Sequence, residues 1–242
     1  DIARRRLVFE EFFTLSLGLI RLRGRERSAT AVRLSRVDLS PFETSLPFSL
    51  TDAQKKAIDE ILADMQKPYP MNRLLQGDVG SGKTMVAAAA AYATAKNGFQ
   101  TAIMAPTEIL AGQHAATFGK VLEPLGVRVC LLTGSLTPKQ KAERKAAIAA
   151  GEFDVIAGTH ALVQQSTEFC SLGLVVTDEQ HRFGVEQRRL LAGKGDSPHS
   201  LVMSATPIPR TLALILYGDL DVSVLDELPP GRQPIATYAV GS

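Results

Sequence analysis

The sequence predicts an α/β fold with a mainly parallel central sheet, and three observations support this prediction. First, short apolar runs rich in β-branched residues alternate with helix-like stretches along most of the 242 residues. Second, these runs do not alternate apolar with polar residues, which is typical of parallel strands buried on both faces. Third, a polar cluster follows each run, at the position where open α/β sheets bind ligands. The six runs cover residues 74–75, 101–104, 127–132, 153–157, 172–177 and 200–203.

The composition is that of a globular protein. Hydrophobic residues make up 45% of the chain and charged residues 21%, which excludes wholesale disorder and a coiled coil. No apolar run reaches the roughly 18 residues that a membrane-spanning helix needs, and nothing resembles a signal peptide. Cys130 and Cys170 lie in apolar runs without metal-ligand spacing. They predict buried thiols in a protein of a reducing compartment.

The net charge of +2 is distributed unevenly. Residues 1–36 hold nine arginines, no lysine and four acidic residues, a balance of +5, so the remainder carries −3. Within this segment, residues 5–22 have apolar side chains at helical spacing and predict an amphipathic helix. The basic segment indicates either that its arginines bind a polyanion near the N-terminus or that they are in contact with solvent.

The pattern divides the chain into three parts. Residues 1–45 are expected to form the N-terminal helix and a linker, 46–235 a core domain, and 236–242 the start of a further connection. Thr51 is suited to cap a helix that runs to about Gln66, where Pro68 and Pro70 follow. A second, alanine-rich helix is expected over residues 85–96.

One motif carries specific chemistry. The stretch GDVGSGKT fits the phosphate-binding pattern G-x-x-x-x-G-K-[ST] in full, between an expected strand and an expected helix. Its glycines let the backbone close around phosphates at a helix N-terminus. Lys83 is then expected to neutralise the β- and γ-phosphates, and the Thr84 hydroxyl to bind Mg²⁺. The predicted nucleotide-binding residues here are Gly77, Asp78, Val79, Gly80, Ser81, Gly82, Lys83 and Thr84.

A phosphate-binding loop of this kind needs an acidic partner on a neighbouring strand. Asp178 and Glu179 directly follow the apolar run 174–177. Asp178 is therefore expected to hold Mg²⁺ and Glu179 to activate the attacking water, which makes both catalytic candidates with Lys83. Gln180 and His181 are candidates for sensing the γ-phosphate or for structural hydrogen bonds.

Five stretches in order resemble motifs I, Ia, Ib, II and III of superfamily 2 helicases. They are residues 77–84, 105–113 (APTEILAGQ), 158–162 (GTHAL), 178–181 (DEQH) and 204–211 (SATPIPRT). The longer stretches DEQHRFGVEQR, MSATPIPRTLA and GDLDVSVLDELPPGR are similar to bacterial ATP-dependent DNA helicases that remodel stalled forks and Holliday junctions in recombination and repair. The similarity covers residues 46–237. An alternative is the motor of a transcription-repair coupling translocase, which shares two of these stretches.

The resemblance implies a RecA-like P-loop NTPase domain, a three-layer sandwich, in a monomeric cytoplasmic protein of bacteria. It implies ATP and Mg²⁺ as cofactors and branched or forked DNA, bound without sequence preference, as the partner. Phe48 and Gln54 resemble the motif that binds adenine. Gln180, Ser204 and Thr206 resemble the motifs that couple ATP hydrolysis to DNA binding. The implied DNA contacts are Pro106, Thr107, Glu108, Gly134, Ser135, Thr159 and His160. The basic stretch Lys139, Lys141, Arg144 and Lys145 is expected to contact phosphate or to face solvent.

The resemblance also implies a second RecA-like domain, and the 242 residues are expected to hold only the first. Such a chain is expected to bind ATP and Mg²⁺ weakly and not to unwind DNA. Two other function classes remain. In a small-molecule P-loop kinase, the DEQH and SAT stretches would have no function. A non-catalytic nucleic-acid-binding module would not need Lys83, Thr84, Asp178 and Glu179.

Overall fold

The computed structural model describes residues 6, 9, 10, 13, 14, 32–178, 190–205 and 220–227. The first five of these are helical, as the apolar spacing predicts, and the rest of the predicted helix 5–22 lies outside the described residues. Within it, the rings of Phe9 and Phe13 stack with their centroids 5.9 Å apart. Both rings are more than half exposed.

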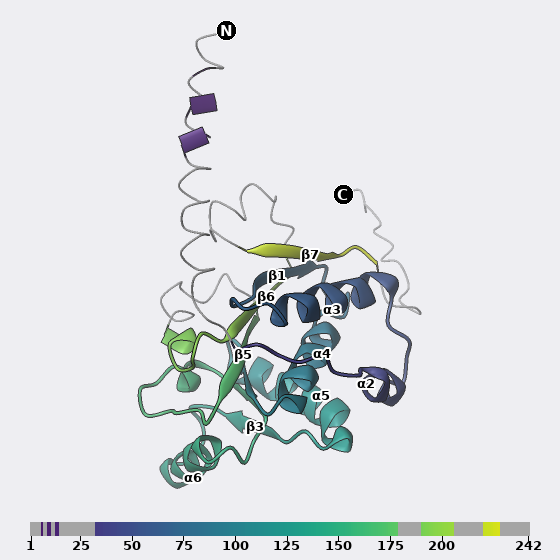
Figure 1. Ribbon diagram of the computed structural model, residues 1–242. Coiled ribbons are helices and arrows are strands. Elements are labelled where there is room, and N and C mark those ends of the chain that lie inside the picture. The colour runs from purple at the N-terminus through teal and green to yellow at the C-terminus, as the bar shows by residue number, and fades with distance from the viewer. Residues whose placement is uncertain are drawn as a thin grey trace, which may run out of the picture.

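The described residues form one parallel sheet of seven strands in the order β3-β4-β2-β5-β6-β1-β7 (Figure 1). This confirms the predicted α/β class, and each of the six predicted runs overlaps a strand; the runs 127–132 and 153–157 each begin two residues before theirs. The seventh strand, β7, was not predicted, because Asp221 and Ser223 interrupt its apolar residues and no apolar run results. The strands are β1 (Asn72–Gly77), β2 (Gln100–Met104), β3 (Val129–Leu132), β4 (Val155–Gly158), β5 (Leu172–Asp178), β6 (His199–Ser204) and β7 (Asp221–Leu225).

Helices cover both faces of the sheet and make the predicted three layers. On one face, α3 (Asp52–Met65), α4 (Lys83–Lys96) and α5 (Glu108–Leu122) pack on residues such as Ile103 and Val176. On the other face, α6 (Pro138–Ala149) and η2 (His160–Leu162) pack on residues such as Met104 and Val175. Successive side chains of one strand thus enter different cores, since they point to opposite faces of the sheet.

The predicted start of α3 is confirmed in detail. The Thr51 hydroxyl accepts a hydrogen bond from the Gln54 amide at 3.2 Å, and the Gln54 side chain accepts one from the Thr51 amide at 3.0 Å. This reciprocal capping box satisfies two backbone donors that a helix start otherwise leaves unpaired. The alanine-rich α4 is buried along most of its length.

The segment expected as a linker packs on the core where the structure describes it. Helix α2 (Ser40–Ser45) buries Phe42, and Leu34 is buried with its amide donating to the Met65 carbonyl at 3.0 Å. The apolar contacts of residues 32–46 therefore continue those of the core domain. The boundary at residue 46 stays a prediction. A short 3-10 helix, η1 (Glu123–Leu125), follows α5.

The prediction of two buried thiols is wrong for one of them. Cys130 is buried in β3, and burial raises the pKa of its thiol. Cys170 is exposed, because it lies in the loop before β5 and not in a strand. Among the described helices, none is both long and apolar enough to cross a membrane.

His199 fixes the segment before α2 to the sheet. Its fully buried ring accepts a hydrogen bond from the Met71 amide at Nδ1 (2.9 Å) and donates one from Nε2 to the Val32 carbonyl (2.7 Å). Burial lowers the pKa of His199, so the folded protein holds it neutral. The unfolded chain takes up this proton below about pH 6.5.

We therefore expect stability to fall as the pH drops below about 6.5, by up to about 1.4 kcal/mol per pH unit. Urea unfolding of the wild type and of His199→Gln at pH 7.5 and pH 5.5 measures this loss. The glutamine variant, which does not titrate, is expected to lose less stability over the interval. Equal losses in the two proteins would show that His199 is not the titrating group.

Candidate functional site

The carboxyl ends of all seven strands meet at one edge of the sheet because the strands are parallel. The order of the strands divides this edge into two halves. The loop after β1, the end of β6 and the end of β5 lie side by side, and they carry the predicted motifs I, III and II. On the other half, β3, β4 and β2 are neighbours, and the predicted DNA-contacting residues follow these strands. We call these the nucleotide half and the DNA half.

The glycine-rich loop joins β1 to α4 as the motif predicts. Gly80 and Gly82 have φ angles of 82° and 85°, a left-handed backbone that glycine adopts at low cost. Lys83 begins α4, and its ammonium donates to the carbonyls of Gly77 at 2.6 Å and Asp78 at 2.9 Å. The loop thus brings an ammonium group and a helix N-terminus together, and both favour an anion.

Two further observations fit a phosphate group in this loop. The Ser81 hydroxyl is buried, and it has no hydrogen-bond partner among the described residues. A Cβ atom on Gly77 would lie only 2.6 Å from that hydroxyl, so the loop needs a glycine there to curve this tightly. Such a buried, unpaired hydroxyl costs free energy unless a ligand provides a partner.

Gln54 connects α3 to the glycine-rich loop. Its side chain is 2% exposed and donates from Nε2 to the Ser81 carbonyl at 2.8 Å, while its oxygen completes the capping box. A Cβ atom on Gly82 would overlap the same amide nitrogen. Both ends of this amide are engaged within the protein, and its contact with adenine stays a prediction. Phe48, its predicted companion, is 46% exposed.

Asp178 ends β5, two strands from β1, with β6 between them. Two strand spacings amount to about 10 Å. Ser204, at the end of the intervening β6, is buried and pairs in register with Gln76, directly before the glycine-rich loop. Asp178 makes a hydrogen bond that the sequence did not predict, with its Oδ2 lying 2.6 Å from Nε2 of His114. Four further predicted site residues lie outside the described residues: Glu179, Gln180, His181 and Thr206.

A glutamate joins two loops of the DNA half. Thr107 caps α5 by accepting a hydrogen bond from the Leu110 amide at 3.3 Å. The next residue, Glu108, accepts one from the Ser135 amide at 3.0 Å, and the hydrogen bonds from Ser135 hold the pKa of Glu108 below its usual value. Pro106 directly precedes Thr107, and Thr159 and His160 follow β4 on the neighbouring strand.

The basic side chains of α6 are largely engaged with neighbouring loops. Lys141 donates to the Gly134 carbonyl and Arg144 to the Leu131 carbonyl. Lys145 donates to side-chain oxygens of Gln164 and Ser166, and Lys139 lies 3.9 Å from Glu143. Lys141, Arg144 and Lys145 therefore fix α6 to adjacent segments. The sequence had predicted contact with phosphate or with solvent, and it did not predict these contacts within the protein.

Sequence reasoning missed His114, although a signal was present. On α5 the buried positions are Ala111, His114, Phe118 and Leu122, which form one helical stripe. A histidine on an otherwise apolar stripe needs a buried partner, and Asp178 provides it. The contact between Glu108 and Ser135 had no such signal, because the two residues are 27 positions apart.

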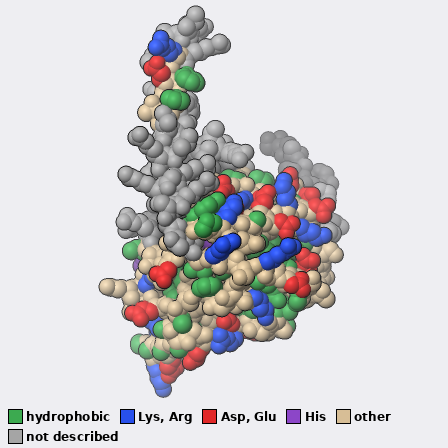
Figure 2. Space-filling model, viewed as in Figure 1, with side chains coloured by type: hydrophobic (Ala, Val, Ile, Leu, Met, Phe, Trp, Pro, Cys, Tyr) green, Lys and Arg blue, Asp and Glu red, His purple; other side chains and the backbone are tan. Residues whose placement is uncertain are grey.

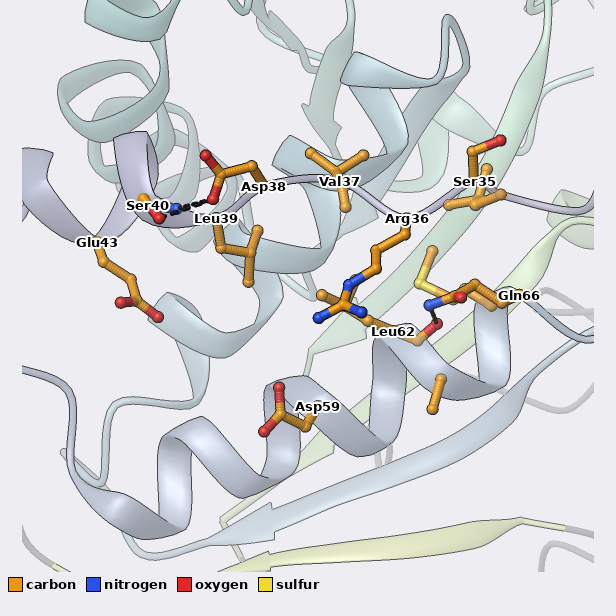
Figure 3. Close-up of a pocket in the computed structure, with 14 residues that line it drawn as sticks. Ser35, Arg36, Val37, Asp38, Leu39, Ser40, Glu43, Asp59, Leu62 and Gln66 are labelled. Carbon is orange, nitrogen blue, oxygen red and sulfur yellow. Dashed lines mark hydrogen bonds between the residues drawn. The ribbon is translucent and has the colours of Figure 1, made fainter.

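The described surface has other hollows that the predicted nucleotide residues do not line. A cavity of about 660 Å³ lies between the segment 34–40 and helix α3. Figure 3 shows Arg36 reaching toward α3, where Asp59 and Leu62 line the opposite wall.

The face seen in Figure 2 mixes Lys and Arg with Asp and Glu side chains, in keeping with the balance of −3 after residue 36. Among the described residues, no group of three or more His, Cys, Asp or Glu side chains is placed to hold a metal ion.

Comparisons with known proteins identify clear relatives. The family model for DEAD/DEAH box helicases matches residues 51–215. The chain is 54% identical to the ATP-dependent DNA helicase RecG of Bacillus subtilis, covering 99% of this chain and 36% of RecG. It is 50% identical to RecG of Thermotoga maritima, covering 98% of this chain and 31% of that protein. It thus spans about a third of the length of these relatives.

Solved structures agree with this match. A structure of RecG bound to a three-way DNA junction superposes with a TM-score of 0.84 at 47% identity, covering 96% of this chain and 32% of that one. The UvsW helicase from bacteriophage T4 superposes with a TM-score of 0.58 at 18% identity, covering 81% of this chain and 69% of that one, and so shares the fold alone.

Proposed function

Because the chain belongs to the DEAD/DEAH box helicase family, we propose that it is the ATP-binding motor domain of a helicase that remodels branched DNA. The high identity to RecG, a helicase solved in complex with a three-way junction, favours this function over a transcription-repair coupling translocase. The proposed location is the bacterial cytoplasm, and the proposed state is a monomer.

One observation carries the proposal: three predicted motifs meet on adjacent strands. The glycine-rich loop after β1, Ser204 on β6 and Asp178 on β5 lie next to one another at the nucleotide half. A loop that binds phosphates then faces a carboxylate across one intervening strand. This is the arrangement that a bound nucleotide with its metal ion requires.

The side chains present fit ATP and Mg²⁺. The loop amides, Lys83 and the buried Ser81 hydroxyl would hold the phosphates, and Thr84 and Asp178 the metal ion. When bound, Mg²⁺ withdraws charge from the phosphates. In this proposal Glu179 orients and deprotonates the attacking water, His181 contacts the γ-phosphate, and Phe48 and Gln54 contact the adenine. Gln180, Ser204 and Thr206 couple the nucleotide half to DNA.

The DNA half suits contacts with the phosphates of a strand. Thr107, Glu108 and Ser135 are exposed at neighbouring loops, as are Gly134 and His160. Backbone amides and hydroxyls position a strand without reading its bases, so we propose binding that does not depend on sequence. The hydrogen bond between Glu108 and Ser135 would keep two of these loops in register.

Replacing Lys83 with alanine is expected to weaken nucleotide binding by about 10- to 150-fold, because a hydrogen bond to a charged group contributes about 1.5–3 kcal/mol. Titration with a fluorescent ADP analogue and Mg²⁺ measures the affinity. Lys145→Ala is the matched control, since Lys145 contacts Gln164 and Ser166 on the DNA half. An unchanged affinity in Lys83→Ala would refute the assignment of the glycine-rich loop.

A further inference from the structure

A hydrogen bond joins helix α5, which begins at the DNA half, to the carboxylate of the nucleotide half. Nε2 of His114 lies 2.6 Å from Oδ2 of Asp178, and the two side chains are 9% and 17% exposed. Because an ionised carboxylate only accepts hydrogen bonds, the imidazole N–H is the donor. A short hydrogen bond to a charged acceptor, largely shielded from water, is among the stronger ones in proteins.

The histidine ring is itself held firmly. His114 belongs to the buried stripe of α5, and its ring meets the fully buried ring of Phe118 edge-on, with centroids 6.3 Å apart. Strand β2, which precedes α5, pairs directly with β5, so the helix begins beside the strand that carries Asp178. The donor thus comes from a fixed side chain on an element adjacent to the acceptor.

We propose that His114 is a positioning residue that orients the Asp178 carboxylate toward the metal ion of the bound nucleotide. This inference rests on the proposed function, since it takes Asp178 as the residue that holds Mg²⁺. A carboxylate whose Oδ2 is fixed by a donor cannot turn freely, so its Oδ1 keeps one orientation. Residues that hold a metal ligand in this way commonly change metal affinity by about 10–100-fold when they are replaced.

The test compares the affinity for a fluorescent ADP analogue with Mg²⁺ and in EDTA, within each variant of the 242-residue chain. The ratio of the two affinities is the gain from the metal ion. His114→Ala is expected to reduce this gain about 10-fold and to leave the affinity in EDTA unchanged within about twofold. His114→Gln, whose amide N–H replaces Nε2–H, is expected to keep the gain within about threefold of the wild type.

The affinity in EDTA separates positioning from folding. A loss of binding in EDTA as well as with Mg²⁺ in His114→Ala would assign the residue a purely structural role and overturn the inference. A glutamine variant that loses the gain as fully as the alanine variant would also contradict it, because the N–H group would then not be the cause.

Two controls separate this inference from the proposed function. Asp178→Asn is expected to abolish the gain from Mg²⁺, and Lys83→Ala to weaken binding under both conditions. If Asp178→Asn keeps the gain, Asp178 is not the metal ligand and the proposed site fails. If Asp178→Asn loses the gain while His114→Ala keeps it, the site stands and only the role of His114 is overturned.

Discussion

The 242-residue chain by itself is expected to bind ATP but to hydrolyse it at least about 1,000-fold more slowly than a full-length RecG helicase does with DNA. The physical reason is electrostatic. The superfamily 2 resemblance implies an arginine from a second RecA-like domain at the γ-phosphate, and such an arginine contributes about 10³–10⁵ in rate. The chain matches about a third of RecG, so in RecG this side chain would come from the part of the helicase that the chain does not match.

Steady-state phosphate release with forked DNA, with linear duplex and without DNA measures this difference. Full-length RecG of Bacillus subtilis and its segment that matches this chain provide the reference pair, since they differ only in the presence of the remainder. We expect forked DNA to stimulate the full-length protein more than linear duplex does, and neither DNA to stimulate the segment. Unwinding of forked DNA by the 242-residue chain alone would contradict the proposal of a single motor domain.

Replacing Arg73 with methionine is expected to lower the free energy of unfolding by about 3–5 kcal/mol, because it removes the buried guanidinium that pairs with the buried Asp64 carboxylate and leaves Asp64 only its contact with Lys67. Arg73 is 8% exposed on β1 and donates to Asp64 at 2.6 and 3.0 Å. It also donates to Glu60 at 3.0 Å and to Ser223 at 2.7 Å. These partners lie on α3 and on the edge strand β7, so one guanidinium group connects three elements.

Denaturant unfolding measures the loss, and Arg128→Met is the matched control. Arg128 pairs with Asp154 at 2.9 Å, but its side chain is 54% exposed. An exposed pair of this kind contributes about 0–1 kcal/mol. Equal losses of unfolding free energy in the two variants would show that burial does not determine how much Arg73 contributes to stability.

The same ionic network makes the protein sensitive to acid. Burial opposes ionisation of Asp64, but hydrogen bonds from Lys67 and Arg73 outweigh it and lower the pKa of Asp64. A lowered pKa means that the stabilisation is complete above the unfolded value near pH 3.9 and is lost as the pH falls through the folded value. In Arg73→Met, this acid-dependent loss below about pH 4 is expected to be smaller than in the wild type.

The sequence by itself determined the fold class and the position of the glycine-rich loop. The runs around residues 74, 103, 156, 175 and 202 predict strands, because only β-branched and apolar side chains fill a sheet covered on both faces. The order of five motifs predicted the helicase family, which the family model and the RecG relatives confirm. These signals are local, since each depends on residues that are neighbours in the chain.

Only the tertiary structure decided which distant residues meet. It paired β7 with β1, brought His114 to Asp178 across 64 positions, and packed Leu34 and Phe42 on the core where a linker was expected. It also exposed Cys170, which an apolar sequence context had predicted to be buried. For the strand, the hydrogen bond and the packed segment, the deciding energy comes from a partner far along the chain: a strand edge, a carboxylate or an apolar surface. The composition of the chain and the spacing of its residues do not show which distant segments meet. That becomes known only with the order of the strands in the sheet.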